Sequence, residues 1–294
     1  MLQSALNDLI AQVFGSTAKI ITQRPMTGGC INTVQQLELD NGILLVAKTN
    51  PNPPPHFFQR EAEGLKTLSE VQAGPMTPKA LAWNAHVLLM SHIDTGPRTD
   101  RSAAKLGNAL ARMHQMRQTH HGFEFDNYLG ESPQPNPKQK NGVAFFQNAR
   151  LAHFLNLADA TCRIPRSISE DIKQLIDELP VRLAIPNSEA PSLLHGDLWS
   201  GNWVADKDEE PWLIDPACHY GFRETDIAMT ELFGGFPPEF YRAYEAVLPL
   251  AEGYTKRRPI YQLVHMLNHV ALFGAGYLAD CRRLLQQLEP IEKC

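Results

Sequence analysis

The sequence predicts an α+β fold in two lobes, with an antiparallel sheet and helices in the first and mostly helices in the second. Residues 1–93 alternate β-rich runs with turn formers, and Asn41-Gly42 between two such runs is a strong hairpin signal. Beyond residue 94, apolar residues recur mainly at helical spacing. Residues 193–215 interrupt those helices with short apolar runs that each lead to a carboxylate. We therefore divide the chain into lobes at 1–93 and 94–294.

The interrupting stretch carries the chemistry. His195-Gly196-Asp197 is followed after four residues by Asn202 and, after a short hairpin, by Asp215. This order matches the catalytic loop and metal aspartate of protein-kinase-like phosphotransferases. Asp197 is predicted to accept or orient a hydroxyl proton, and Asn202 and Asp215 supply the hard oxygen donors that Mg²⁺ prefers. His-Gly-Asp alone could be an ordinary turn, but the spaced Asn and Asp favour a kinase that uses ATP and Mg²⁺.

Composition excludes several other classes. A net charge of −5 without a strong basic block argues against nucleic acid as the main partner. The apolar runs are too short to cross a bilayer, and the N-terminus is typical of an amphipathic helix, not a signal peptide. The five cysteines form no C-x-x-C pair, which favours a reduced, cytoplasmic setting. We expect no membrane partner and a monomer or weak dimer.

The first lobe is predicted to cover the nucleotide. In chain order, we expect a helix over 2–14, strands over 19–24, 33–39 and 43–48, a helix over 57–68, and a hairpin from 83 to 90. Ser91, His92 and Ile93 then link the two lobes, where adenine can hydrogen-bond to backbone groups.

Two features of this lobe point to phosphate binding. Gly28-Gly29 forms a turn between strands, which is weak evidence alone, but it precedes a strand ending in Lys48, where kinases keep a phosphate-binding lysine. Kinases pair that lysine with a helical glutamate. Glu61 and Glu63 both compete, and Glu61 is preferred because it shares a helix face with apolar residues. No G-x-x-x-x-G-K-[ST] is present, which excludes a Walker-type site.

The second lobe is predicted to be helical around the catalytic stretch. Ser102 is the expected N-cap of a helix to about residue 118, and further helices are expected over 142–158, 168–183, 227–233 and within 238–291. The polar, Pro-rich segment 125–136 is predicted to be an unstructured binding loop or lid.

Several polar residues of this lobe have competing interpretations. His114, His120 and His121 lack further ligands at metal spacing, so helix-surface and loop roles are favoured. His265 and His269 have zinc-helix spacing without the accompanying glutamate, which favours helix packing. The polar run after Asp215 contains Arg223, Glu224 and Asp226, for which substrate contact and scaffold roles stay equally open.

A set of longer motifs resembles one family. The most specific are Thr27-Gly28-Gly29-Cys30-Ile31-Asn32, Asp126-Asn127-Tyr128 with Pro133-Gln134-Pro135-Asn136, and His195-Gly196-Asp197-Leu198-Trp199-Ser200-Gly201-Asn202. They resemble the fructosamine kinase (ketosamine-3-kinase) family, which is related to aminoglycoside and choline phosphotransferases with the protein-kinase-like fold. The resemblance runs nearly end to end.

The resemblance implies a substrate and an activity. The γ-phosphate of ATP would pass to the 3-hydroxyl of a ketosamine, a fructosamine- or ribulosamine-type Amadori adduct of a small amine or a protein lysine. The product would then break down and free the amine, which is a deglycation repair. A kinase for another alcohol, of the aminoglycoside or choline kinase type, and a nucleotide-binding pseudokinase are the alternatives.

The candidate substrate contacts are Trp199, His195, Tyr220, Arg223 and Asn127. Trp199 offers a flat apolar face for a sugar, or a π-face for a protonated amine, and a packing role is the less favoured alternative. Positions that depart from the family pattern are Thr27, Ser91-His92, His219 and Phe222. These departures leave the particular ketosamine open. Cys30 carries a further hypothesis, that its oxidation blocks ATP binding or links two chains, against the alternative of a small loop residue.

Overall fold

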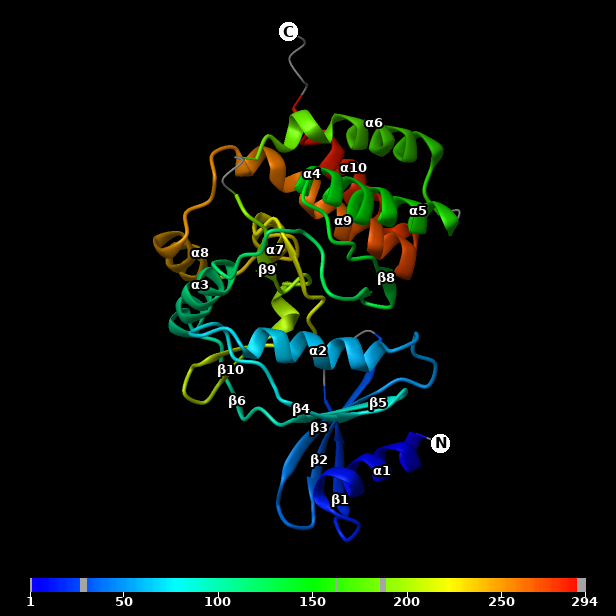
Figure 1. The fold of residues 1–294 in the computed structure, drawn as a ribbon, viewed down its shortest axis with the longest axis vertical. Helices are drawn as coiled ribbons and strands as arrows, with labels where there is room; N and C mark the ends of the chain where they lie inside the picture. Colours follow the sequence, from blue (N-terminus) through cyan, green and yellow to red (C-terminus); the bar gives the residue numbers. More distant parts are fainter. Residues whose placement is uncertain (1, 27–30, 162, 186–188, 290–294) are drawn as a thin grey trace.

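A five-stranded antiparallel sheet forms the N-terminal part of the chain, and helices dominate the C-terminal part (Figure 1). The computed structural model describes residues 2–26, 31–161, 163–185 and 189–289. The sheet has the order β1-β2-β3-β5-β4. Its strands are β1 (Ile20–Pro25), β2 (Thr33–Leu39), β3 (Leu44–Thr49), β4 (Ala80–Trp83) and β5 (Val87–Ser91). The predicted α+β class and the early hairpins are confirmed.

Two helices cover opposite faces of this sheet. Because side chains alternate along a strand, Val87 and Leu89 of β5 pack with the core beneath α1 (Leu2–Phe14). Leu88 and Met90 point the other way and pack with α2 (Phe57–Ser69). Lys48 pairs with Leu88 across β3 and β5, so it also belongs to the α2 face. Figure 1 shows α2 between the sheet and the C-terminal helices.

The C-terminal part is built around α9 (Tyr254–Phe273), which packs against α5, α7 and α10. The other helices are α3 (Asp100–His114), α4 (Gly142–Phe146), a π-helix η1 (Gln147–Ala152), α5 (His153–Ala160), α6 (Arg166–Leu183), α7 (Glu224–Thr230), α8 (Pro238–Val247), a 3-10 turn η3 (Ala275–Tyr277) and α10 (Leu278–Gln286). None of the helices in the described ranges is both long and apolar enough to span a membrane.

Short strands carry the catalytic stretch. They are β6 (Thr95–Gly96), β9 (Ser192–Leu194), β10 (Trp203–Asp206), β11 (Pro211–Leu213) and β12 (His219–Gly221), with a 3-10 turn η2 (Ser200–Asn202) before β10. β10 pairs with β11 and β6, and β12 pairs with β9. The hairpin of β10 and β11 therefore joins the two candidate metal ligands, as the spacing predicts.

The start and end of α3 differ from the prediction. Thr99, not Ser102, is the N-cap, and its hydroxyl accepts from the Ser102 N–H while the Ser102 hydroxyl faces the Thr99 N–H, which completes a capping box. The helix ends at His114 because the following backbone pairs elsewhere. Leu193 N–H donates to Met116 O, and Gln118 N–H donates to Pro191 O.

The predicted loop over 125–136 is also ordered differently. It contains a short hairpin of β7 (Asn127–Leu129) and β8 (Ser132–Gln134), which turns at Gly130 with φ +63°. The side-chain amides of Gln134 and Asn136 both donate to Asn127 Oδ1, at 2.9 Å each. Hydrogen bonds between polar side chains therefore order this segment, although its polar, Pro-rich sequence is typical of an unstructured loop.

Two of the histidines expected on helix surfaces or in loops are instead buried. His114 is fully buried at the end of α3, between the Tyr244 hydroxyl at 2.8 Å and Asp226 at 3.2 Å. His121 lies in a connecting segment, as expected of a loop residue, but its ring is enclosed by Phe145 and Phe222. The prediction rested on the absence of metal ligands nearby in the sequence. The groups that enclose the two rings, such as Asp226 and Phe222, lie about a hundred residues away in the chain.

Candidate active site

Lys48 is held between two carboxylates at the inner face of the sheet. Its Nζ lies 2.5 Å from Glu61 Oε1 on α2 and also contacts Asp215 Oδ1. The predicted Lys48–Glu61 pair is confirmed, whereas Glu63 pairs with Arg60 on the outer side of α2. Burial alone would lower the pKa of Lys48, but the charges and hydrogen bonds of Asp215 and Glu61 outweigh it and raise that pKa. Lys48 is thus a permanent, fixed cation.

The turn that presents Asp197 requires a glycine. Gly196 has φ +84°, and a Cβ there would lie 2.1 Å from Ala217 O, so any side chain would break the turn. His195 ties this turn to the strand that leads to Asp215, because its Nδ1 accepts from the Asp197 N–H and its Nε2 lies 2.9 Å from Ile214 O. His195 is fully buried by these contacts. It positions the loop and does not line the cleft.

A second anchor of this turn is Asp226. Its Oδ2 accepts from the His195 N–H at 2.7 Å, and its Oδ1 accepts from the Gly196 N–H at 2.9 Å. His114 Nε2 lies 3.2 Å from the same carboxylate. Burial raises the pKa of Asp226, but the hydrogen bonds and the charges of His114 and His195 outweigh it, so the pKa is lowered. The scaffold alternative therefore holds for Asp226.

The three residues with kinase-like spacing converge. Asn202 Nδ2 donates to the backbone oxygen of Asp197 at 2.8 Å and to its Oδ2 at 3.1 Å. Asp215 adopts φ 56°, a left-handed conformation that costs energy for a non-glycine residue and that clusters at functional sites. Burial, and then the charge of Asp215, raise the pKa of Asp197 to about 7, although the Asn202 hydrogen bond lowers it.

This donor set fits a small divalent cation. Two carboxylates lie close enough for one to raise the pKa of the other, and the Asn202 amide nitrogen faces Asp197, which leaves its carbonyl oxygen as a possible ligand. Hard oxygens in small number are the ligands that Mg²⁺ takes from a protein. The described residues contain no group of three or more His, Cys, Asp or Glu arranged to hold a metal. The fit is therefore to an ion that shares its shell with a ligand and water.

A cavity of about 940 Å³ opens between the sheet and the helices, above these groups. Its lining includes nine of the residues predicted for the active site, namely Lys48, Glu61, Ser91, Ile93, Asn127, Asp197, Trp199, Asn202 and Asp215. Of the other candidates, His92 instead faces Gln36, whose Nε2 lies 3.0 Å from its Nε2. Gly28, Gly29 and Cys30 lie outside the described residues.

The Trp199 ring packs directly on a glycine. A Cβ at Gly201 would fall 2.2 Å from the indole, so the ring lies directly over that glycine. The Trp199 ring also packs edge-to-face with Phe233, with ring centroids 6.5 Å apart. The indole therefore lines the cavity next to Asp197 in one fixed place. Asn127 also lines the cavity, but its side-chain amide donates to Cys218 O and accepts from Gln134 and Asn136.

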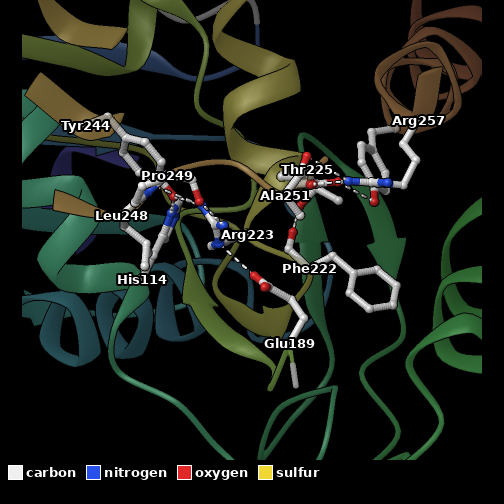
Figure 2. A network of polar contacts seen from close by, with 12 residues as sticks. His114, Glu189, Phe222, Arg223, Thr225, Tyr244, Leu248, Pro249, Ala251 and Arg257 are labelled. Carbon is white, nitrogen blue, oxygen red and sulfur yellow. Dashed lines mark hydrogen bonds and ion pairs between the residues drawn. The ribbon is translucent and has the colours of Figure 1, made fainter. Parts of the chain in front are cut away.

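Arg223 and Tyr220 lie away from the cavity lining. Figure 2 shows the Arg223 guanidinium turned toward Glu189, at 2.6 Å, and toward the backbone oxygens of Leu248 and Pro249. Tyr220 is half-buried and packs beside Phe123. These contacts favour a scaffold role for both.

Glu224 has a similar role. It receives two hydrogen bonds from Arg257, at 2.7 and 2.6 Å, and one from the Tyr261 hydroxyl at 2.9 Å. The polar run after Asp215 thus ties α7 to the elements that follow it, and the charged residues of that run act within the protein.

One residue of the cavity was not singled out for chemistry by the sequence. His265 of α9 lines the cavity, and its Nδ1 lies 3.9 Å from Asp197 Oδ1. Burial, and then the neighbouring His269, lower the pKa of His265 to about 3, so the imidazole is neutral. Helix packing was the favoured interpretation of this pair. The only sequence signal was their shared helix face, which cannot show what the face meets.

Comparison with known proteins places this geometry in a family. A sequence profile described as fructosamine kinase matches residues 2–290. A protein-ribulosamine 3-kinase of Arabidopsis thaliana, named as chloroplastic, is 35% identical over 283 residues, which span 92% of this chain and 83% of that protein. A solved protein of Thermobifida fusca, provisionally named a fructosamine-3-kinase, superposes with a TM-score of 0.87 at 30% identity, covering 96% of this chain and 98% of its own.

More distant structures share the fold alone. A choline kinase from Streptococcus pneumoniae has a TM-score of 0.68 at 14% identity, over 97% of this chain and 98% of its own. The bilobal kinase-like architecture therefore extends beyond the close relatives. From the end-to-end profile match and the relatives above, this chain belongs to the fructosamine kinase family.

Proposed function

We propose that this chain is an ATP-dependent kinase that phosphorylates the 3-hydroxyl of a ketosamine. The observation that carries the proposal is the placement of Asp197 beside Trp199 in one cavity that also holds Lys48 and Asp215. A phosphate-binding cation, a carboxylate for a hydroxyl proton and an apolar face for a sugar are thereby within one site. Membership of a kinase family implies ATP as the phosphoryl donor. The ketosamine assignment rests on the names of the relatives.

The residues divide the work of the transfer. Lys48, fixed by Glu61, donates to the phosphates of ATP. Asn202 and Asp215 would hold Mg²⁺, which neutralises phosphate charge when bound. Asp197 takes the proton of the sugar hydroxyl. The hydroxyl oxygen bonds to the γ-phosphorus, and the bond between that phosphorus and the oxygen of ADP breaks. The pKa of Asp197 near 7 suits a group that accepts a proton at neutral pH.

We also propose that residues 1–93 cover the nucleotide and residues 94–294 hold the substrate. The lining of the cavity supports this division, because Val46, Ser91 and Ile93 of the first part line it together with Asp197 of the second. Those backbone and apolar groups suit an adenine ring. The predicted free ketosamine and the glycated protein lysine remain alternative substrates, since both present the same sugar hydroxyl.

The test is phosphate transfer with defined acceptors. The purified protein would be incubated with ATP, a magnesium salt and, separately, a synthetic fructosamine, a ribulosamine, choline and an aminoglycoside, with mass spectrometry of the products. We expect phosphorylation of a ketosamine and loss of at least about a thousandfold in kcat for Asp197→Asn. Preferred phosphorylation of choline or an aminoglycoside would overturn the ketosamine assignment. ATP binding without transfer to any acceptor would favour a pseudokinase.

A further inference from the structure

A run of aromatic rings continues outward from Trp199 along one wall of the cavity. Phe233, after α7, packs edge-to-face with the Trp199 ring, and its ring centroid lies 5.2 Å from that of His269 on α9. His269 in turn lies 5.4 Å from Phe273 and 4.9 Å from Tyr277, measured between ring centroids. Each of these five residues lines the cavity. We call this set, Trp199, Phe233, His269, Phe273 and Tyr277, the aromatic wall.

The wall is apolar in its faces and free of positive charge. The described residues that line this end of the cavity, on α7, α9 and η3, include no lysine or arginine. The faces of aromatic rings carry the negative part of a quadrupole, so a set of such faces attracts both a cation and apolar groups. Phe273 is 46% exposed, which places the outer end of the wall at the mouth of the cavity. A ligand bound along the wall would therefore extend from Asp197 to solvent.

The histidine of the wall presents a hydrogen-bond acceptor. His269 Nδ1 lies 2.7 Å from the backbone oxygen of His265, so Nδ1 carries the proton and Nε2 of the neutral ring accepts. Burial lowers the pKa of His269, which keeps the ring neutral. This acceptor suits a ligand that carries an N–H group.

In a ketosamine the amine lies close to the hydroxyl that receives the phosphate. Only C1, C2 and C3 of the sugar lie between the amine nitrogen and the hydroxyl that faces Asp197. The secondary amine is protonated at neutral pH, and whatever it carries must extend away from the catalytic loop. Trp199 lies two residues beyond Asp197 and begins the wall that leads outward.

We propose that the aromatic wall is the subsite for the amine half of the substrate, and that it selects ketosamines whose amine bears an aromatic or extended apolar group. The inference rests on the proposed function and assigns the part of the cavity that the phosphoryl transfer itself does not use. Trp199 and the Nε2 acceptor of His269 hold the ammonium, while Phe233, Phe273 and Tyr277 contact its substituent.

The test compares two adducts of one ketose, with benzylamine and with methylamine, on the wild type and on Phe273→Ala and Tyr277→Ala. We expect a KM about tenfold lower for the benzylamine adduct in the wild type, because ring contacts with two or three aromatic residues are added. Each substitution should reduce that preference to about threefold or less. Val181→Ala, at a 63% exposed residue of α6, is the matched truncation outside the cavity and should keep the full preference.

The outcomes separate the two proposals. If the wild type phosphorylates both adducts without preference, or if the variants keep the wild-type preference, the aromatic wall is not the amine subsite although the proposed function stands. If the wild type phosphorylates neither adduct, nor any other ketosamine, the proposed function fails and the subsite fails with it. Should Phe273→Ala not fold, as judged by thermal unfolding, Phe273→Leu retains bulk without a ring and decides through the same ratio.

Discussion

Asp226 shows how much of the site depends on a residue that does not line the main cavity. Its carboxylate accepts the backbone N–H groups of His195 and Gly196 and contacts His114. These bonds fix the turn from which Asp197 projects. A buried carboxylate with several charge-assisted hydrogen bonds is costly to alter, because its donors are then left without a partner.

Replacing Asp226 by asparagine should therefore damage both stability and turnover. One carboxylate oxygen becomes an NH₂ group that faces a donor, so we expect a loss of about 2–4 kcal/mol in the free energy of unfolding. Urea unfolding and ketosamine turnover would measure the two effects. Asp280→Asn, which breaks a surface pair with Arg283, is the control and should cost under about 0.5 kcal/mol. Equal effects of the two substitutions would contradict the anchoring role.

Gly201 offers a second test at the same scale, because the Trp199 ring lies on it. The methyl group of an alanine there would displace the indole without removing it. We expect Gly201→Ala to raise the KM for the ketosamine by about tenfold or more and to change the KM for ATP by less than about threefold. Steady-state kinetics with each substrate varied in turn measures both. An unchanged ketosamine KM would show that the position of the ring is not used in binding.

At the scale of elements, the hairpin of β7 and β8 joins the two parts of the chain. Glu131 in its turn accepts from the Asn50 amide at 3.0 Å, and the Tyr128 hydroxyl donates to Pro55 O at 2.9 Å. On the other side, the backbone oxygen of Leu129 accepts from Asn268 of α9. The segment expected to be an unstructured lid is therefore a clamp between the sheet side and the helical side.

Loosening that clamp should weaken nucleotide binding. Tyr128→Phe combined with Glu131→Ala removes both hydrogen bonds to the N-terminal part, each contributing about 1 kcal/mol, so we expect the KM for ATP to rise by about three- to thirtyfold. Glu124→Ala, at an exposed pair with Lys138, is the matched control and should leave that KM unchanged. The clamp would be refuted by a double variant that binds ATP as tightly as the wild type.

Elements also explain what could be predicted. Lys48 was found because it ends a strand at the position where kinases keep a phosphate-binding lysine. Glu61 was found because it shares a helix face with apolar residues, and the helical period decides which way its side chain points. No local pattern decided between substrate contact and a scaffold role for Asp226, and none showed that His265 lies beside Asp197. Their partners, the turn at His195 and Asp197, lie far away in sequence, so no local pattern could show that α7 and α9 reach the same turn.

At the scale of the whole molecule, the two parts share one cleft, and neither half of the site is complete alone. Lys48 and Glu61 come from the sheet and α2, while Asp197, Asn202 and Asp215 come from the β9 to β11 region. The order of these residues in the sequence predicted the class of fold. The packing of α9 against the catalytic turn, which places His265 there, follows only from the assembled core.

The assembled core also buries histidines, which makes the stability of the protein sensitive to acid. Burial lowers the pKa of His114, His195 and His219, and it lowers those of His121 and His265 to about 4 and about 3. The unfolded chain binds a proton at each near pH 6.5. Between pH 6.5 and the lower folded values the unfolded state holds more protons, so stability present above pH 6.5 is lost as the pH falls. Asp197 and Glu61 oppose this trend, because burial raises the pKa of both carboxyl groups.

His121→Phe isolates one of these contributions, because the ring lies between Phe145 and Phe222 and its Nδ1 has no hydrogen-bond partner among the described residues. Phenylalanine keeps the ring contacts and cannot take a proton. At pH 5 the variant should gain about 1–2 kcal/mol relative to wild type beyond any difference at pH 7.5, since the unfolded His121 is then protonated and the folded one is not. Urea unfolding at the two pH values measures this difference, and the value at pH 7.5 serves as the control for packing. Parallel loss of stability in both proteins on acidification would mean that His121 does not contribute to the acid sensitivity of the fold.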